Sequence, residues 1–154
     1  MENTKLKETI RENSIPKLLE YFQEFEQGQK PLGEKVETKF RAAFHKDIAG
    51  LVSHIALKGI EWANDNTSAK QVKQELDKII NRFGPKLFCL AQNRVDKWQK
   101  SLNQKGKYDA ASRVPNTALK AVGKVMESDL GATINFVSEN KQINTAKNQK
   151  TLAA

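Results

Sequence analysis

The sequence predicts an all-α protein, a single-domain bundle of five to six helices with a flexible C-terminal tail. First, apolar residues recur at steps of three and four along most of the chain, which is the period of an amphipathic helix. Second, short segments rich in Gly, Pro, Asn, Asp and Ser separate these periodic stretches. Third, a chain of 154 residues with 38% hydrophobic content suits one globular core. We therefore assign residues 1–140 to the bundle and residues 141–154 to the tail.

The N-terminal region is expected to hold two short helices and a loop. Leu6 and Ile10 lie one turn apart, as in a first helix that ends before Ser14. Ser14 can cap a second helix, and Pro16 is tolerated in its first turn, where the missing N–H costs nothing. That second helix is expected to stop at the loop 28–33, which contains two glycines and a proline.

The middle of the chain predicts a long central helix followed by a polar turn. Residues 34–63 keep a helical apolar period. Residues 64–68 are typical of a turn and of helix capping, so we expect Thr67 or Ser68 to start the next helix. That helix is expected to end at residues 84–85, because glycine is common just past a helix end and proline at the start of the next helix.

The most regular apolar pattern predicts a helix over residues 85–104. Five of its residues share one face: Phe88, Ala91, Val95, Trp98 and Leu102. Residues 107–116 lack an apolar period and contain a proline, so we expect a loop there. A final helix is expected over residues 116–130, and the pattern of residues 131–140 suits a helix or a strand.

The apolar faces of these helices define the predicted core. We expect the following residues to be mostly buried: Phe44, Ile48, Val52, Ile55, Leu76, Ile80, Phe88, Val95, Trp98, Val122 and Met126. Trp98 belongs to this set by its spacing, and Trp62 also lies on an apolar helix edge. We therefore assign both tryptophans to the core and not to a surface that stacks on nucleic-acid bases.

The positive charge of the chain is concentrated in one segment. Residues 81–124 contain ten Lys/Arg and only two acids, Asp96 and Asp109, so their net charge of +8 equals that of the whole chain. An amphipathic helix ordinarily carries lysines on its solvated face, and a merely solvated face would be enough to explain a run of three lysines. The shortage of acids instead favours binding of nucleic acid or another polyanion.

The predicted binding surface combines one helix face with the segment that follows it. Helical spacing puts Lys86, Lys97 and Lys100 opposite the apolar face, with an arginine on one flank. An exposed tyrosine in the following loop can stack on an unpaired base. The residues that we expect to bind nucleic acid are Lys86, Arg94, Lys97, Lys100, Lys105, Lys107, Tyr108 and Arg113.

The sequence offers little for catalysis, metals or cofactors. His45 and His54 are the only histidines, and their spacing on one predicted helix turns them to nearly opposite sides, so they cannot share a metal ion. An acid–base site on one helix face is a third hypothesis, built from His54, Asp47, Lys58 and Glu61. Cys89 is the only cysteine, and we interpret it as a buried structural thiol. No glycine-rich phosphate loop is present.

Together these observations predict a non-enzymatic, cofactor-free protein that binds the phosphate backbone of DNA or RNA through residues 86–113, alone or as a small subunit of a larger nucleoprotein complex. The alternative is a protein-interaction module, an effector or adaptor, whose same basic face docks an acidic protein. The chain shows no signal peptide and no apolar stretch near the roughly 18 residues of a membrane span. We therefore expect a cytoplasmic location, with unconventional secretion left open.

Overall fold

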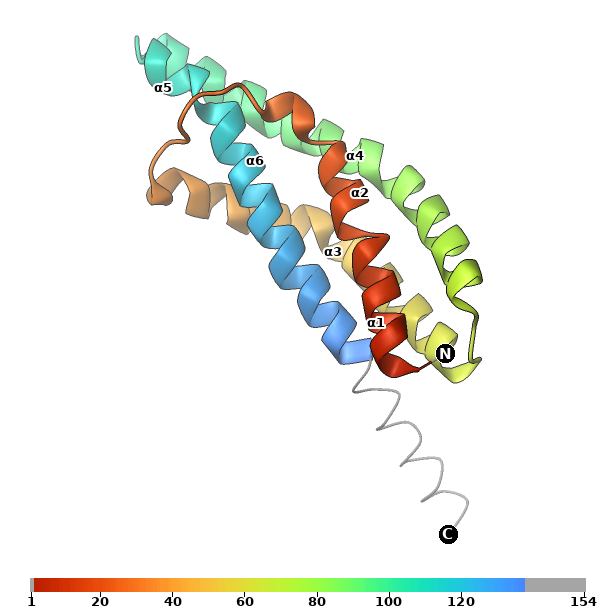
Figure 1. The fold of residues 1–154 in the computed structure, drawn as a ribbon. Coiled ribbons are helices and arrows are strands. Elements are labelled where there is room, and N and C mark those ends of the chain that lie inside the picture. Colours follow the sequence, from red (N-terminus) through yellow and green to blue (C-terminus); the bar gives the residue numbers. More distant parts are fainter. Residues whose placement is uncertain (1, 138–154) are drawn as a thin grey trace.

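The computed structural model describes residues 2–137, which form a bundle of helices without a strand. Figure 1 shows how the elements follow one another. In chain order they are α1 (Asn3–Glu12), α2 (Ile15–Glu20), the 3-10 helix η1 (Gln23–Phe25), α3 (Glu34–Asn64), α4 (Ala69–Gln104), α5 (Tyr108–Ser112), α6 (Val114–Val125) and the π-helical segment η2 (Met126–Leu130). The helix of η2 continues through residues 131–137. The all-α prediction is confirmed.

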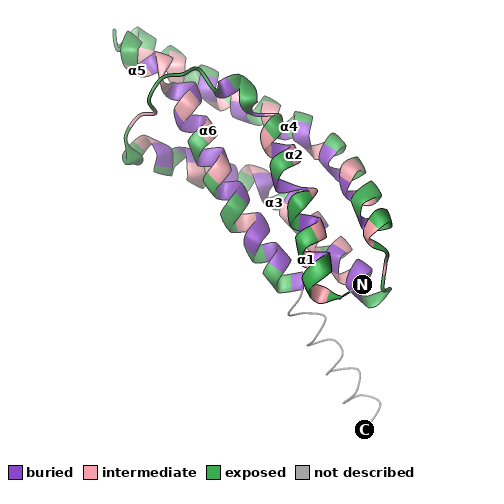
Figure 2. Ribbon diagram, viewed as in Figure 1, coloured by how far each residue is buried: buried purple, intermediate pink, exposed green. Residues whose placement is uncertain are grey.

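The two long helices form the frame of the bundle. A tight polar turn joins α3 to α4, so the two helices run antiparallel. In Figure 1, α6 lies along α3, while α1 and α2 lie in front and contact α4. The sides of the helices that face one another carry the buried residues (Figure 2).

The residues predicted for the core do lie in or against it. Most are buried, and the exceptions are Val52, Phe88 and Trp98, which are half-buried and pack against the core. Trp62 is 3% exposed, as expected for a core tryptophan. Trp98 lies at the edge of the core, so part of its indole surface remains accessible to a ligand.

Helix α4 continues through Pro85, so the predicted helix end at residues 84–85 is wrong. A proline inside a helix removes one backbone hydrogen bond and usually bends or ends the helix. Here the residues on both sides of Pro85, including Ile80 and Leu87, are buried in the same core. Gly84 also lets the ring of Tyr21 approach the helix backbone closely. Packing along the whole length of α4 therefore compensates for the missing hydrogen bond.

The segment 107–116, predicted as a loop, is mostly helical. Residues 108–112 form α5, and α6 begins at Val114 with Pro115 in its first turn, where proline is well tolerated. Ala111, Val114 and Pro115 are buried, which ties the segment to the core. A helix of five residues is too short to show an apolar period, so the sequence pattern alone does not reveal it.

The remaining boundaries are partly as predicted. Ser68 caps α4, and its hydroxyl accepts a hydrogen bond from the Gln71 backbone N–H at 3.2 Å. Ser14 occupies the N-cap position of α2, but its side chain forms no capping hydrogen bond; the hydroxyl instead donates to the carbonyl oxygen of Ile10. The second helix ends earlier than expected, at Glu20, and a 3-10 turn replaces its last part.

The described residues include only the first part of the C-terminal segment for which the sequence left helix or strand open. Of the residues left open between helix and strand, 131–137 are helical. Residues 138–140 and the predicted tail 141–154 lie outside the described residues. Within residues 2–137, no helix has both the length and the apolarity needed to cross a membrane.

Candidate functional site

The residues predicted to bind nucleic acid divide into two groups in the structure. In the first group the ammonium groups are exposed, and none of them forms an ion pair with another described residue. This group consists of Lys86, Lys97, Lys100, Lys105 and Lys107. Tyr108 is 69% exposed and begins α5, directly after these lysines. We call the five residues the unpaired lysines.

Arg94 belongs to the second group, because the fold already uses its charge. Its Nε and Nη2 atoms each donate a hydrogen bond of 2.8 Å to one carboxylate oxygen of Asp47. Such a two-pronged pair holds both side chains in a fixed geometry. The hydrogen bond to Asp47 raises the pKa of the Arg94 guanidinium above its ordinary value. Arg94 therefore joins α4 to α3 and carries little uncompensated charge.

Arg113 has a similar structural role at the other end of the basic segment. Its Nε and Nη2 atoms donate to the carbonyl oxygens of Lys30 at 2.8 Å and Pro31 at 2.7 Å. These bonds attach the loop before α3 to the connection between α5 and α6. A guanidinium bound to two backbone carbonyls keeps its charge but has few free N–H groups for a phosphate. The sequence did not distinguish such cations from the unpaired lysines.

Two further cations of the basic segment balance a buried carboxylate. Glu37 is 3% exposed at its side chain, and its oxygens lie 2.7 Å from Lys124 Nζ and 3.8 Å from Lys120 Nζ. Burial raises the pKa of the Glu37 carboxyl, but the hydrogen bond from Lys124 and the charges of Lys124, Lys120 and Arg41 outweigh it. The net effect holds the Glu37 pKa below its ordinary value. This cluster joins α3 to α6.

A groove between α3 and α4 lies beside the unpaired lysines. It has a volume of about 410 Å³, and its walls come from α3, from α4 and from Lys105, which directly follows α4. Lys39, Arg94, Lys97 and Lys105 line it together with the rings of Phe40 and Trp98. Among the described residues, no carboxylate lines this groove. We call it the Trp98 groove.

A second hollow of about 250 Å³ opens further along the same pair of helices, around His54. Lys58, Lys78 and Arg82 line it as well. The predicted acid–base set does not come together here, because Asp47 is bound to Arg94 and Lys58 pairs with Glu61 at 3.6 Å. The His54 ring instead lies 5.7 Å from the ring of Phe83. Glu75 also lines the hollow, and its carboxylate accepts a hydrogen bond from Trp62 Nε1. Three cations and one carboxylate therefore lie around His54, and that carboxylate is not one of the acids in the third hypothesis.

The two histidines contact different elements, as their spacing predicts. His45 Nδ1 lies 2.7 Å from Asp129 Oδ2 of η2, whereas His54 lies against α4. In the described range, no group of three or more His, Cys, Asp or Glu residues could hold a metal ion. These contacts give each histidine a separate structural environment.

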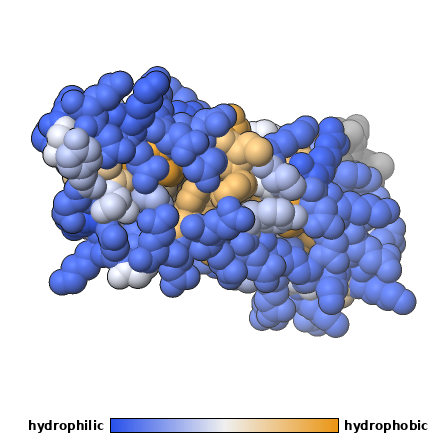
Figure 3. Space-filling model, turned by 90° about the horizontal axis from the view of Figure 1, so that it is seen from above, coloured by the Kyte–Doolittle hydropathy of each residue, from blue (hydrophilic) through white to orange (hydrophobic). Residues whose placement is uncertain are grey.

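Apolar surface also interrupts the basic face of α4. Cys89 is exposed, so its interpretation as a buried thiol is wrong. Leu90 is 42% exposed and lies on the same helix face as Lys86 and Lys97. Because of Leu90, this face of α4 is not uniformly charged. Elsewhere on the molecule too, apolar side chains reach the surface between hydrophilic regions, as the view from above shows (Figure 3).

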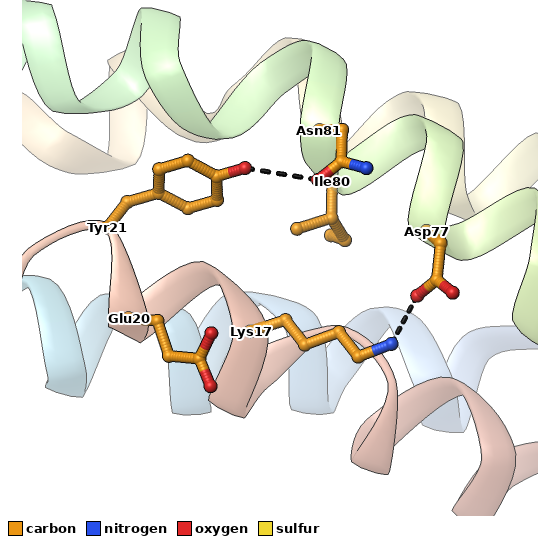
Figure 4. A pocket seen from close by; sticks show the side chains of 6 residues that line it. All are labelled: Lys17, Glu20, Tyr21, Asp77, Ile80 and Asn81. Atoms are coloured by element: carbon orange, nitrogen blue, oxygen red, sulfur yellow. Dashed lines mark hydrogen bonds and ion pairs between the residues drawn. The ribbon is translucent and has the colours of Figure 1, made fainter.

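Another hollow, with a volume of about 470 Å³, lies between α2 and α4, and contacts across it join the two helices (Figure 4). Lys17 pairs with Asp77 across it, and Tyr21 Oη donates to Asn81 Oδ1 at 3.2 Å. One cation, Lys17, and two carboxylates, Glu20 and Asp77, line this hollow, so its charge does not favour a polyanion. For this reason we place the candidate site at the unpaired lysines and the Trp98 groove and not at this larger hollow.

Comparisons of the chain with protein-family models, curated proteins and solved structures found no significant match.

Proposed function

We propose that this chain is a non-enzymatic protein that binds the phosphate backbone of nucleic acid through the unpaired lysines of α4 and of the connection to α5. The observation that carries the proposal is that these five lysines are exposed and have no acidic partner among the described residues. Lysine side chains on flexible stems neutralise phosphates without requiring a base sequence. Lys97 and Lys105 also line the Trp98 groove, which extends the cationic surface onto α3.

The size of the surface suits several phosphates. Residues 86–100 of α4 span roughly 21 Å along the helix axis, given a rise of about 1.5 Å per residue. Double-stranded DNA carries one charge per roughly 1.7 Å of its axis, so a surface of this length meets several phosphates. Asp96 is the one acid of α4 in this stretch, and its carboxylate accepts a hydrogen bond from Gln92 at 2.8 Å. Cations outnumber acids along the whole stretch.

The proposal covers DNA and RNA and includes a role as a small subunit of a nucleoprotein complex in the cytoplasm. The alternative partner is an acidic protein surface. Both partners present negative charge, so salt weakens the binding of either one. Nucleic acid adds the release of condensed counterions, which gives a slope of log K against log salt set by the number of phosphates contacted. Direct binding of a nucleic acid with such a slope decides between them.

A salt titration tests the proposal. Anisotropy of a labelled DNA duplex should show binding at low salt, with log K falling linearly against log salt. The variant Lys97→Glu/Lys100→Glu should fold normally and flatten the slope by about 1.8, because each lost phosphate contact removes about 0.9. The matched control is Lys70→Glu/Lys73→Glu, which makes the same charge change at exposed positions near the start of α4. These positions lie roughly 40 Å away along the helix.

Absence of binding by the wild-type protein at low salt would reject the proposal. Equal loss of affinity in the two double variants would show that only the net charge matters and that the assigned surface is wrong. Selective capture of an acidic protein, without any affinity for nucleic acid, would favour the protein-interaction module.

A further inference from the structure

The Trp98 groove places an aromatic ring among cations, and its ring surface is accessible. The groove volume of about 410 Å³ lies within the range of about 300–1,000 Å³ that is usual for small-molecule pockets. Trp98 is half-buried, with the ring of Phe40 at a centroid distance of 5.4 Å and the ammonium of Lys39 over the indole at 5.7 Å. The indole is thus supported by the core and reaches into the groove.

The contact from Lys39 is one that a ligand can displace. Lys39 is exposed and forms no ion pair within the described residues, and a cation over an aromatic ring at an exposed site is a weak interaction. A planar base stacked on the indole would take the place of this ammonium. Lys39 would then be free to pair with a neighbouring phosphate, so that the displacement keeps its charge within the complex.

The α4 wall of the groove offers donors for a phosphate. Lys97, Ser101 and Lys105 all line it and are four residues apart, which puts them on one side of the helix at intervals of roughly 6 Å. The two ammonium groups flank a hydroxyl, and no carboxylate in the described range lines the groove. A phosphate at this wall therefore meets positive charge and hydrogen-bond donors without like-charge repulsion.

From this geometry we infer that the Trp98 groove is a subsite for one nucleotide of a single-stranded nucleic acid, with the base stacked on Trp98 and the backbone phosphate held by Lys97, Ser101 and Lys105. This inference rests on the proposed function and narrows it to a preference for single strands over duplexes. The bases of a duplex are paired and stacked inside it, whereas those of a single strand can turn out onto an aromatic side chain. Aromatic stacking is tolerant of sequence, so the subsite accepts any base.

Tryptophan fluorescence of the wild-type protein tests the inference directly. Three probes separate its parts: an oligothymidine single strand, a blunt DNA duplex, and inorganic polyphosphate, which has phosphates but no bases. Trp62 is 3% exposed, so a change of emission on contact with a base reports Trp98. The single strand should quench the emission and bind more tightly than the duplex. Polyphosphate should bind without such quenching.

Two variants complete the test. Trp98→Leu keeps an apolar side chain against Phe40 and should weaken binding of the single strand roughly 5- to 150-fold, the usual effect of losing one base–aromatic stack. Its affinity for polyphosphate should stay unchanged, which a merely structural role of Trp98 would not explain. Ser101→Glu places a carboxylate in the groove at an exposed position outside the core. It should abolish the quenching while thermal unfolding shows an intact fold.

The outcomes distinguish this inference from the proposed function. Equal affinity for single strand and duplex, with no change of tryptophan emission, would overturn the inference and leave backbone binding intact. Quenching by polyphosphate equal to that by the oligonucleotide would also overturn it, because the signal would then not require a base. Failure of all three probes to bind at low salt would overturn both the inference and the proposed function.

Discussion

Gly84 lies directly against the ring of Tyr21, so a Cβ atom at position 84 would stand 2.4 Å from Tyr21 Cε2. The contact joins α2 to α4 next to Pro85, where the backbone of α4 lacks one hydrogen bond. Tyr21 Oη also donates to Asn81 Oδ1 one turn earlier on α4. Because Gly84 has no side chain, α2 can pack against α4 next to the position where α4 lacks a backbone hydrogen bond.

Gly84→Ala should therefore lower the free energy of unfolding by about 1–3 kcal/mol, the usual range for overpacking. Alanine normally stabilises a helix interior by about 1 kcal/mol relative to glycine. Gly50→Ala is the matched control, because Gly50 lies inside α3 with nothing within 4 Å of a new Cβ. Urea unfolding should show opposite signs for the two variants. Stabilisation by Gly84→Ala would mean that Tyr21 moves aside freely.

Removal of the Arg94 side chain should reduce stability and leave nucleic-acid binding largely intact. Arg94→Met leaves the Asp47 carboxylate, which is 11% exposed, without its partner, and this should cost about 1–3 kcal/mol. Lys97→Met, at an exposed lysine without an ion pair, should change stability by less than about 0.5 kcal/mol. Chemical denaturation and salt-dependent binding of the two variants test whether Arg94 stabilises the fold and Lys97 binds nucleic acid.

A double variant isolates the Arg94–Asp47 interaction itself. Asp47→Ala added to Arg94→Met should recover part of the lost stability, because the unpaired carboxylate is removed. Additive losses in the double-mutant cycle would contradict the pairing. A loss of salt slope in Arg94→Met equal to that of Lys97→Met would show that Arg94 contacts phosphate.

Glu37 should make the stability depend on acid pH. Its pKa in the folded protein lies below the ordinary value of 4.5, so the folded state binds fewer protons than the unfolded state in that region. The resulting stabilisation is complete above the unfolded pKa and is lost as the pH falls through the lower folded pKa. Glu37→Gln should therefore lower the free energy of unfolding by more at pH 7 than at pH 3. Denaturation of both proteins at the two pH values measures this difference, and a constant gap would contradict the assignment.

Tyr108 should contribute to binding of single strands through its ring. The side chain is 69% exposed, so Tyr108→Ala should alter stability by no more than about 0.5 kcal/mol. Its affinity for oligothymidine should fall by about 1–3 kcal/mol, the range for one stacked base. Tyr108→Phe keeps the ring and is the matched control. If both variants bind as the wild type does, Tyr108 lies outside the interface.

The candidate site was predictable to the extent that it follows from helix spacing. The alternation of apolar and charged residues placed Lys86, Lys97 and Lys100 on the outer side of α4, and all three are exposed. The same reasoning assigned Trp98 to the core, because an apolar residue on the buried stripe gives no sign of lying at its edge. Whether such a residue is enclosed depends on the neighbouring helix, and α3 leaves part of Trp98 open.

Local sequence patterns were enough to predict the helical class, the long helix α3, a start of α4 at Thr67 or Ser68, and the concentration of charge between residues 81 and 124. These features depend on local periodicity and local hydrogen bonds. Tertiary packing instead sets the continuation of α4 through Pro85, because the stabilising contacts come from the distant Tyr21 and the shared core. It also decided which cations remain unpaired, since the partners of Arg94, Arg113 and Lys124 lie tens of residues away along the chain.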